Sequence, residues 1–307
     1  MVGVRACVRR VLVARRACWF VAVLALACQA SLSAHAEETV DKIRRTHTLV
    51  VAYAPNQFPF VSVEDGQPVG YAIDICNRIA DGLRRELRLP QLQVRYLEVD
   101  TRSRFDAIAD GQADIECGTT TNNAARRNRF AFTIPHFFTT TRMMVRRDSG
   151  IRSWRDLRER RVVMVRGTSV VPYAKARDAS GLLNIQWVQI DREADAMSML
   201  QQAQVDAYAD DDVMLYSYRS MASDPGALVI VGEALSVDPY AMMMRQDPAF
   251  KALVDREMVR MISTREIHAL YRQWFLAPAG GGRVAMNLPM GYLLRDSFNF
   301  PTDKVAQ

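Results

Sequence analysis

The sequence predicts an α/β protein made of two similar lobes. Apolar strand-like segments alternate with amphipathic helical segments, which is typical of parallel sheets with crossover helices. In addition, a pattern of five residues recurs 92 positions later with the same spacing. The residues Phe105, Ile108, Gly111, Gln112 and Asp114 match Met197, Leu200, Ala203, Gln204 and Asp206. Each copy predicts a short helix, a turn and a strand, so we expect one such unit in each lobe.

The expected first lobe begins with a buried strand at residues 48–53. The residues Glu-Asp-Gly-Gln at 64–67 favour a hairpin turn, and a helix follows that reaches about residue 86. Residues 93–97 alternate in polarity and predict a second strand. Strand, helix and strand in this order indicate a parallel sheet with crossover helices, and such sheets bind ligands at the carboxyl ends of their strands.

The second lobe repeats this organisation. A helical turn is expected at 154–157, a strand at 161–165, and then a turn rich in glycine and hydroxyl groups at 166–169. The β-branched run at 137–145 has no break and predicts one long strand that leaves the first lobe, while 237–244 predicts the strand that returns to it.

Two crossings between lobes make a hinge, with the ligand in the cleft between them. We therefore expect lobe 1 to comprise residues 37–140 and 241–307, and lobe 2 to comprise residues 141–240.

Residues 1–36 have the features of a secretory signal peptide. They contain five arginines and no acidic residue, an apolar run at 17–28, and the small-residue cleavage signal Ala-His-Ala at 34–36. The apolar run is too short to cross a bilayer. A periplasmic location is therefore expected. Lipid anchoring at Cys28 is the less favoured alternative, because the three residues before it make a poor lipidation signal.

Charge and composition exclude several function classes. The 40 Lys and Arg fall to 35 without the five arginines of the signal peptide, against 34 Asp and Glu, so the net charge is near +1. No basic block remains, so neither nucleic acid nor an anionic membrane is expected as a partner. Met242 to Met244 predict a core strand rather than a metal site, and no cofactor is expected. Cys76 and Cys117 can form a disulfide or stay free thiols.

The segment 114–126 is a candidate carboxylate-binding turn. A strand end leads into Gly118, three threonines and two asparagines, and then into a helical segment with Arg126 in its first turn. The free N–H groups of a helix start and a guanidinium both attract anions. The alternative is an ordinary capped turn with a solvated arginine. The 92-residue offset carries Thr119 onto Asp211. An anion site in one lobe and a carboxylate in the other fit an α-amino acid.

Short motifs support this reading across nearly the whole chain after residue 36. They are Asp41-Lys42-Ile43, Phe58-Pro59-Phe60, Val69-Gly70-Tyr71, Glu116-Cys117-Gly118 with the following threonines and asparagines, Asp211-Asp212, Trp274-Phe275, Met286-Asn287-Leu288 and Pro301-Thr302-Asp303-Lys304. With them the chain resembles the periplasmic amino-acid-binding proteins of ABC importers, and most closely their glutamate/aspartate-binding branch. The resemblance implies a type II periplasmic binding protein fold, a monomer, a permease partner in the inner membrane, and binding without catalysis.

The resemblance also implies which residues hold the backbone of the ligand. They are Arg126, Thr121, Thr168 and Ser169 for the α-carboxylate, and Asp211 and Thr119 for the α-ammonium. A bidentate arginine–carboxylate pair gives both direction and strength. Asp212, rather than Asp211, is expected to cap the helix that follows.

The residues expected around the ligand's side chain depart from the glutamate/aspartate pattern. Thr101 and Arg104 keep one element of it, but Ala54 replaces an arginine and Glu193 falls about where a histidine is expected. We therefore expect that Arg104 pairs with Glu193 and leaves room for a polar neutral side chain such as an amide. If the alignment is one residue off, Arg192 takes the place of Glu193 and an acidic ligand fits again.

An enzymatic alternative uses the same scaffold. Some periplasmic relatives resemble this fold and act as cyclohexadienyl (prephenate or arogenate) dehydratases, which need an acid or base in the cleft. Glu193 is the candidate for that role in this sequence.

Overall fold

The computed structural model describes residues 38–278 and 286–304. The fold described below is that of the compact unit formed by residues 39–307. The predicted signal peptide and Cys28 lie outside the described residues. Within the described ranges, no helix has the length and apolar character needed to cross a membrane.

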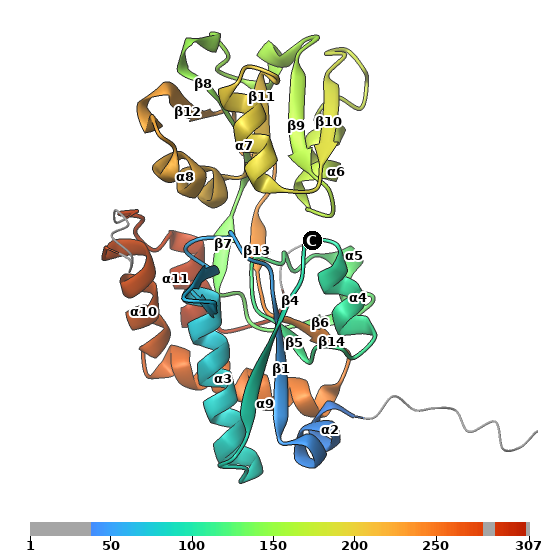
Figure 1. Cartoon of the computed structure of the whole chain (residues 1–307), viewed down its shortest axis with the longest axis vertical. Helices are drawn as coiled ribbons and strands as arrows, with labels where there is room; N and C mark the ends of the chain where they lie inside the picture. Colours follow the sequence, from blue (N-terminus) through green and yellow to red (C-terminus); the bar gives the residue numbers. More distant parts are fainter. Residues whose placement is uncertain (1–37, 279–285, 305–307) are drawn as a thin grey trace, which may run out of the picture. The chain divides into compact units, whose positions relative to one another are not determined.

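The first lobe contains a five-stranded sheet in the order β4-β1-β5-β14-β6 (Figure 1). Its strands are β4 (Gln93–Glu98), β1 (Thr48–Tyr53), β5 (Ile115–Glu116), β14 (Met243–Arg245) and β6 (Phe130–Phe132). Strand β1 runs parallel to both β4 and β5, whereas β14 is antiparallel to β5 and β6. The predicted hairpin is present as β2 (Ser62–Glu64) and β3 (Gln67–Val69).

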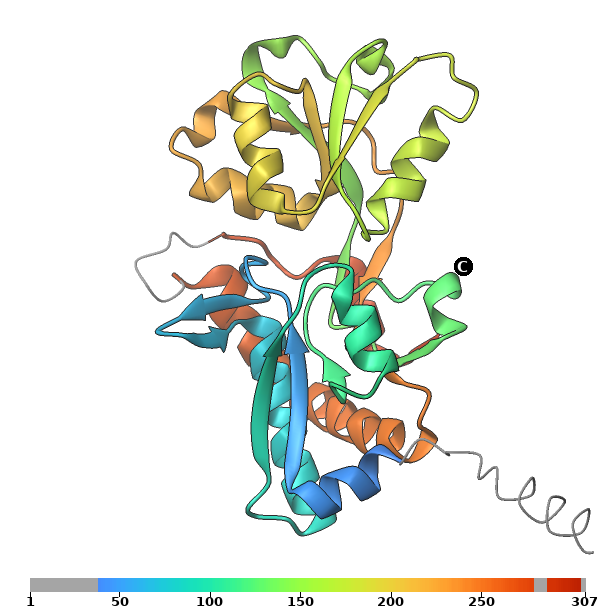
Figure 2. The same ribbon diagram turned by 45° about the vertical axis from the view of Figure 1, so that its right-hand side comes forward.

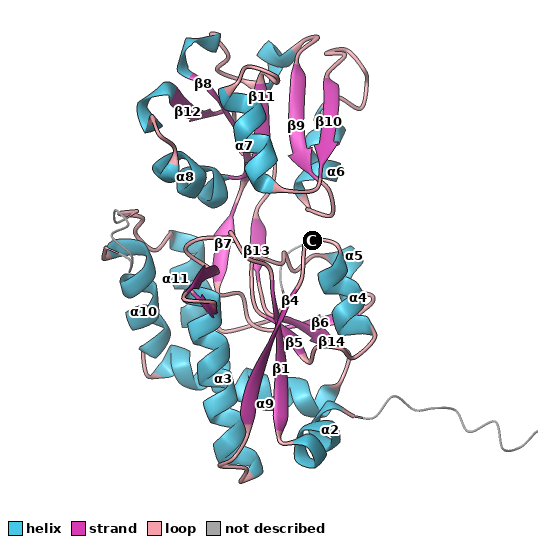
Figure 3. Cartoon of the chain, in the orientation of Figure 1, coloured by secondary structure: helices cyan, strands magenta, loops and turns pink. Residues whose placement is uncertain are grey.

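Helices cover both faces of this sheet (Figure 3). They are α2 (Thr39–Thr46), α3 (Tyr71–Leu87), α4 (Ser103–Ala109), α9 (Pro248–Ser263), α10 (Glu266–Tyr271) and, near the C-terminus, α11 (Tyr292–Asn299). Successive residues of a strand point to opposite faces. Leu49 and Val51 therefore share a core with α3, whereas Val50 and Ala52 pack with Ile108 of α4. Burial on both faces explains why residues 49–52 of β1 are all apolar.

The second lobe has a five-stranded sheet in the order β10-β9-β11-β8-β12. Its strands are β10 (Gln186–Ile190), β9 (Arg161–Val165), β11 (Ala207–Asp211), β8 (Thr141–Arg146) and β12 (Leu228–Val231). Its helices are α6 (Val170–Arg177), α7 (Glu193–Gln201) and α8 (Asp212–Met221), and a 3₁₀ turn spans Trp154–Leu157. Strand β9 is parallel to β10 and β11, and β8 is antiparallel to β11 and β12.

The repeated pattern marks equivalent positions in the two sheets. Asp114 precedes β5, and its carboxylate accepts the Val50 N–H of β1 at 2.9 Å. Asp206 precedes β11, and its carboxylate accepts the Arg161 N–H of β9 at 2.8 Å. Each aspartate thus fastens its strand to the start of the neighbouring parallel strand, so the predicted unit is present in both lobes.

Each crossing consists of two strands, so the prediction of unbroken strands is wrong. The outgoing run is β7 (Phe137–Thr139) followed by β8, and the returning run is β13 (Asp238–Tyr240) followed by β14. Strands β7 and β13 pair with each other as an antiparallel ribbon that runs between the two sheets (Figures 1 and 2). The outgoing run breaks at Thr140 because its N–H and hydroxyl donate to the Asp212 carboxylate instead of a strand.

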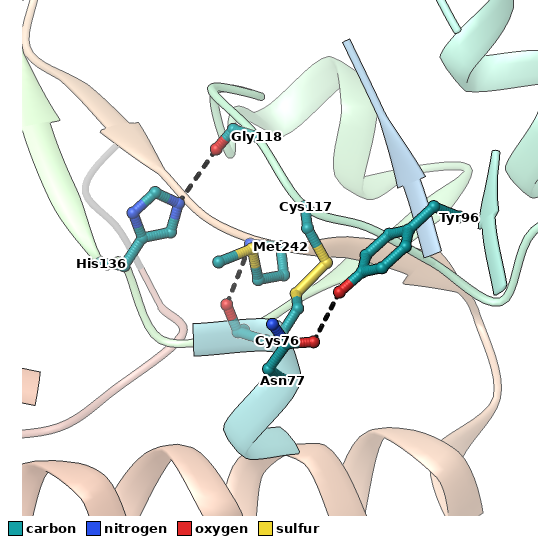
Figure 4. Close-up of a disulfide and its surroundings, with 8 residues drawn as sticks. Cys76, Asn77, Tyr96, Cys117, Gly118, His136 and Met242 are labelled. Atoms are coloured by element: carbon teal, nitrogen blue, oxygen red, sulfur yellow. Dashed lines mark hydrogen bonds between the residues drawn. A yellow bond between two sulfur atoms is a disulfide. The ribbon is translucent and has the colours of Figure 1, made fainter. Parts of the chain in front are cut away.

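Cys76 and Cys117 form a disulfide, which settles the alternative that the sequence leaves open (Figure 4). Cys76 lies on α3, and Cys117 directly follows β5. Next to the bond, Tyr96 donates to Asn77 at 2.6 Å, and the ring of His136 hydrogen-bonds to the Gly118 carbonyl at 3.1 Å. The disulfide and the histidine therefore fix the strand end from which the candidate ligand-binding turn begins.

Candidate functional site

All nine residues predicted to bind the ligand line one cavity. They are Thr101, Arg104, Thr119, Thr121, Arg126, Thr168, Ser169, Glu193 and Asp211. The empty volume between them is about 380 Å³, including the part that opens to solvent. Both lobes contribute residues from loops and helix starts that follow the parallel strands. This matches the rule that parallel sheets bind ligands at the carboxyl ends of their strands.

Hydrogen bonds join the two lobes around this cavity. The Thr101 hydroxyl donates to the Arg166 carbonyl at 3.1 Å, and the Thr121 and Ser169 hydroxyls are 2.9 Å apart. Gly167 allows this approach because its φ is +79° and a Cβ there would lie 2.9 Å from the Thr101 carbonyl oxygen. Any other residue would hold the lobes further apart.

Arg126 is anchored in the first lobe and reaches the second. Its Nη1 donates to the Thr121 carbonyl at 2.9 Å, and its Nη2 donates to the Gly167 carbonyl at 3.2 Å. The guanidinium carbon lies 5.0 Å from the centre of the Phe105 ring. Burial, and then the neighbouring guanidinium of Arg104, lower the pKa of Arg126 to about 10, so it stays cationic at neutral pH.

The helix after the threonines contributes less to anion binding than the sequence suggests. Helix α5 (Ala124–Arg127) has only four residues, and its Arg126 N–H is already taken by the Asn123 side chain at 3.0 Å. A single turn carries a small dipole. The groups suited to a carboxylate are therefore the Arg126 guanidinium and the hydroxyls of Thr121 and Ser169.

Asp211 ends β11 with one unsatisfied carboxylate oxygen. The side chain is buried, its Oδ2 accepts a hydrogen bond from the Tyr240 hydroxyl, and its Oδ1 has no hydrogen-bond partner among the described residues. Burial, with the charges of Asp238 and Asp210, raises the pKa of Asp211 well above its usual range. A buried acceptor without a partner costs about 1–3 kcal/mol, so a cationic donor here would relieve both the missing hydrogen bond and the charge repulsion.

Asp212 does not cap the following helix, so this prediction is wrong. Its carboxylate accepts hydrogen bonds from the Thr139 hydroxyl at 2.7 Å and the Thr140 hydroxyl at 2.9 Å. Helix α8 starts without a side-chain cap. Asp212 instead fastens the outgoing strand where it passes from the ribbon into the second sheet.

Arg104 faces Glu116 rather than the predicted partner Glu193. Arg104 is only 2% exposed, and its Nη1 lies 4.0 Å from Glu116 Oε1. In the part of the chain that the structure describes, no ion pair within 4.0 Å joins Arg104 and Glu193, and Arg104 Nε and Nη1 have no hydrogen-bond partner. Two buried donors near the cavity thus remain to be satisfied.

Glu193, not its neighbour Arg192, forms the wall of the cavity. Arg192 is at the surface with its side chain 77% exposed, where it pairs with Asp195 at 2.8 Å. The alignment in which Arg192 faces the ligand is therefore wrong. Burial raises the pKa of the Glu193 carboxyl, and the charge of Arg104 opposes this rise.

Five further lining residues escaped the sequence analysis: Gln57, Asp210, Met214, Tyr218 and Tyr240. Asp210 had a visible signal, because it is the first of three consecutive aspartates at the end of β11. Its carboxylate accepts hydrogen bonds from the Tyr208 hydroxyl and the Asp211 N–H, and burial raises its pKa to about 7. Tyr240 had no signal in the sequence, since only the return strand β13 brings it beside Asp211. The described residues contain no cluster of three potential metal ligands.

Comparisons with known proteins show which family the chain resembles. The family model of the bacterial extracellular solute-binding proteins, family 3, matches residues 49–277. The L-glutamate/L-aspartate-binding protein of Pseudomonas aeruginosa is 30% identical over 88% of this chain and 90% of its own length. The glutamate/aspartate import solute-binding protein of Escherichia coli is 28% identical over 92% of this chain and 96% of its own length.

Solved structures agree in fold. The P235GK mutant of ArgBP from T. maritima superposes with a TM-score of 0.68 at 20% identity, covering 76% of this chain and 98% of that one. The ancestral amino acid-binding protein AncCDT-1, described as a precursor of cyclohexadienyl dehydratase, superposes with a TM-score of 0.66 at 21% identity. This match covers 77% of this chain and 99% of that one. At this identity the likeness concerns the fold alone.

Proposed function

Because the chain belongs to the bacterial extracellular solute-binding proteins, family 3, we propose that it captures a polar α-amino acid for an ABC importer. The observation that carries this proposal is the pair of opposite anchors in one cavity, the Arg126 guanidinium and the Asp211 carboxyl. In this proposal the protein is a periplasmic monomer that binds without catalysis or cofactor and delivers its ligand to a permease in the inner membrane.

The two anchors fit the two charged ends of an amino acid. The α-carboxylate lies against Arg126, with hydroxyls from Thr121 and Ser169, and with Thr168 beside them. The α-ammonium donates to the free Oδ1 of Asp211, and Thr119 lies in the same cavity wall. Hydrogen bonds to charged groups contribute about 1.5–3 kcal/mol each, and the water-excluded cleft keeps them from being screened.

Capture proceeds by hinge closure. We propose residues 37–140 and 241–307 as one lobe, residues 141–240 as the other, and the β7–β13 ribbon, where the chain passes between them, as the hinge. The hydrogen bonds of Thr101 to Arg166 and of Thr121 to Ser169 then belong to the closed form. The permease recognises this closed form, so ligand binding and delivery are linked through the population of closed molecules.

The proposal is tested by a thermal-shift screen of the refolded, ligand-free protein against the twenty amino acids and prephenate. A ligand at a hundred times its Kd stabilises the folded state by about 2.7 kcal/mol, which gives a clear rise in melting temperature. We expect the largest shift from a polar amino acid. No shift from any amino acid would overturn the proposal.

The dehydratase alternative rests on one observation, the buried Glu193 carboxyl with its raised pKa in the cavity wall. Such a group suits proton transfer. The test is incubation with prephenate. If the wild type consumes prephenate and the Glu193→Gln variant does not, the protein is a dehydratase and the binding-protein proposal is wrong.

A further inference from the structure

The cavity is lined by a buried arginine whose donors are not all satisfied, and by an acidic residue from the other lobe. The donors are Nε and Nη1 of Arg104, which is 2% exposed and makes no hydrogen bond through these atoms within the described residues. The acid is Glu193, at the start of α7 in the other lobe. A ligand group that accepts a hydrogen bond from Arg104 and donates one to Glu193 would satisfy both residues.

The charges around the cavity decide which group fits. The cavity wall carries two arginines, Arg104 and Arg126, and three acids, Glu193, Asp210 and Asp211. Arg104 already faces the fully buried Glu116 at 4.0 Å. Once the α-carboxylate of the ligand neutralises Arg126, the other arginine of the cavity wall is Arg104, which already faces Glu116, so a second ligand carboxylate would add negative charge to a wall that already holds more acids than arginines.

We infer that the ligand's side chain ends in a primary carboxamide, as in glutamine or asparagine. The amide oxygen accepts from Arg104, and the amide nitrogen donates to Glu193. This inference rests on the proposed function, because it takes the two backbone anchors as given and adds the identity of the side-chain group.

Other side chains satisfy only part of this wall. A carboxylate can accept from Arg104, but it lies beside the Glu193 carboxyl, and two acidic groups side by side in a water-poor site cost free energy unless one of them takes up a proton. A lysine or arginine side chain can pair with Glu193 but leaves the Arg104 donors without an acceptor and sets two cations side by side. An apolar side chain leaves both groups unsatisfied, and unpaired buried polar groups are what give such sites their strongest discrimination.

The first test measures wild-type affinities by isothermal titration calorimetry for glutamine, asparagine, glutamate, aspartate, lysine, arginine and leucine. We expect one of the two amides to bind at least tenfold more tightly than the acid of the same length and than any other ligand in the set. Tightest binding of an acidic, cationic or apolar amino acid would overturn the carboxamide inference and leave the proposed function standing. No binding of any amino acid would overturn the proposed function itself.

The second test uses Glu193→Gln, which removes the charge and keeps the size of the side chain. The new amide can donate to a ligand carboxylate, so the ratio of amide to acid affinity should fall at least tenfold. Asp195→Asn is the matched control, because Asp195 lies on the first turn of the same helix and pairs with Arg192 at the surface. An unchanged ratio in Glu193→Gln, or an equal fall in Asp195→Asn, would exclude Glu193 as the specificity group.

Discussion

Replacing Asp211 by asparagine should abolish high-affinity binding without weakening the fold. Asparagine keeps the size of the side chain and an oxygen that can accept from the Tyr240 hydroxyl. It removes the charge that is proposed to hold the α-ammonium. It also removes the repulsion from Asp238 and Asp210 that helps to raise the pKa of Asp211. Binding and stability should therefore change in opposite directions.

The size of the loss follows from the free Oδ1 of Asp211. Truncating one partner of a buried, hydrogen-bonded charge pair costs about 2–5 kcal/mol, and a value of about 3 kcal/mol corresponds to a rise of roughly a hundredfold in Kd. A buried carboxyl with a raised pKa holds its proton more tightly and must lose it to bind an ammonium, so the lower half of this range is appropriate.

Calorimetry gives the affinity, and differential scanning fluorimetry gives the melting temperature of the ligand-free protein at pH 7.5. Asp206→Asn is the control, because Asp206 lies at the other end of the same strand and holds the Arg161 N–H of β9. The control should lower the melting temperature slightly and leave Kd within threefold. If Asp211→Asn binds the ligand within threefold of the wild type, the assignment of the ammonium site is refuted.

Four further outcomes are expected. Arg126→Lys should raise Kd at least tenfold in calorimetry, because an ammonium cannot make two parallel hydrogen bonds to a carboxylate, and an unchanged Kd would contradict the carboxylate site. Ligand binding should release protons and weaken as the pH falls below 7, because an ammonium favours the ionised forms of Asp210 and Asp211; calorimetry in buffers of different ionisation enthalpy measures this, and proton uptake would refute it. Without ligand, the folded state binds more protons at Asp210 (pKa about 7) than the unfolded chain does (pKa about 3.9). The contribution of Asp210 to the free energy of unfolding should therefore fall as the pH rises from about 4 to 7. Denaturant titrations should show a smaller fall in Asp210→Asn, and an unchanged pH profile would contradict the raised pKa. Replacing Cys76 and Cys117 by serine should cost up to about 4 kcal/mol of stability, given their separation of 41 residues, with little change in Kd, and a tenfold weaker Kd would show that the bond also shapes the site.

The elements that the sequence predicts best are those with a purely local signal. The strands at Thr48–Tyr53 and Arg161–Val165 have the predicted bounds, because buried parallel strands are continuous apolar runs that end at polar turns. The residues proposed for the site also converge on one cavity, because parallel strands of both lobes end there.

The wrong predictions concern residues whose hydrogen-bond or ion-pair partner is distant in the sequence. Thr140 interrupts the outgoing strand because Asp212, 72 residues away, takes its N–H and hydroxyl. Arg104 lies against Glu116 rather than Glu193, since only the packing of α4 on the first sheet determines which acid it faces. Neither partner has a signal in the local sequence.

The order of strands in the first sheet has a consequence for how the chain is assembled. Strand β14 lies between β5 and β6, yet it comes after the whole of the second sheet in the chain. During synthesis, which starts at the N-terminus, the second sheet can therefore be completed at residue 231, while the first sheet still lacks the strand between β5 and β6. Until residues 243–245 arrive, β5 and β6 present unpaired edges, which are sites of misassociation. The lobe that is synthesised first is thus the last to be finished, and a factor that shields exposed strand edges would act on that lobe.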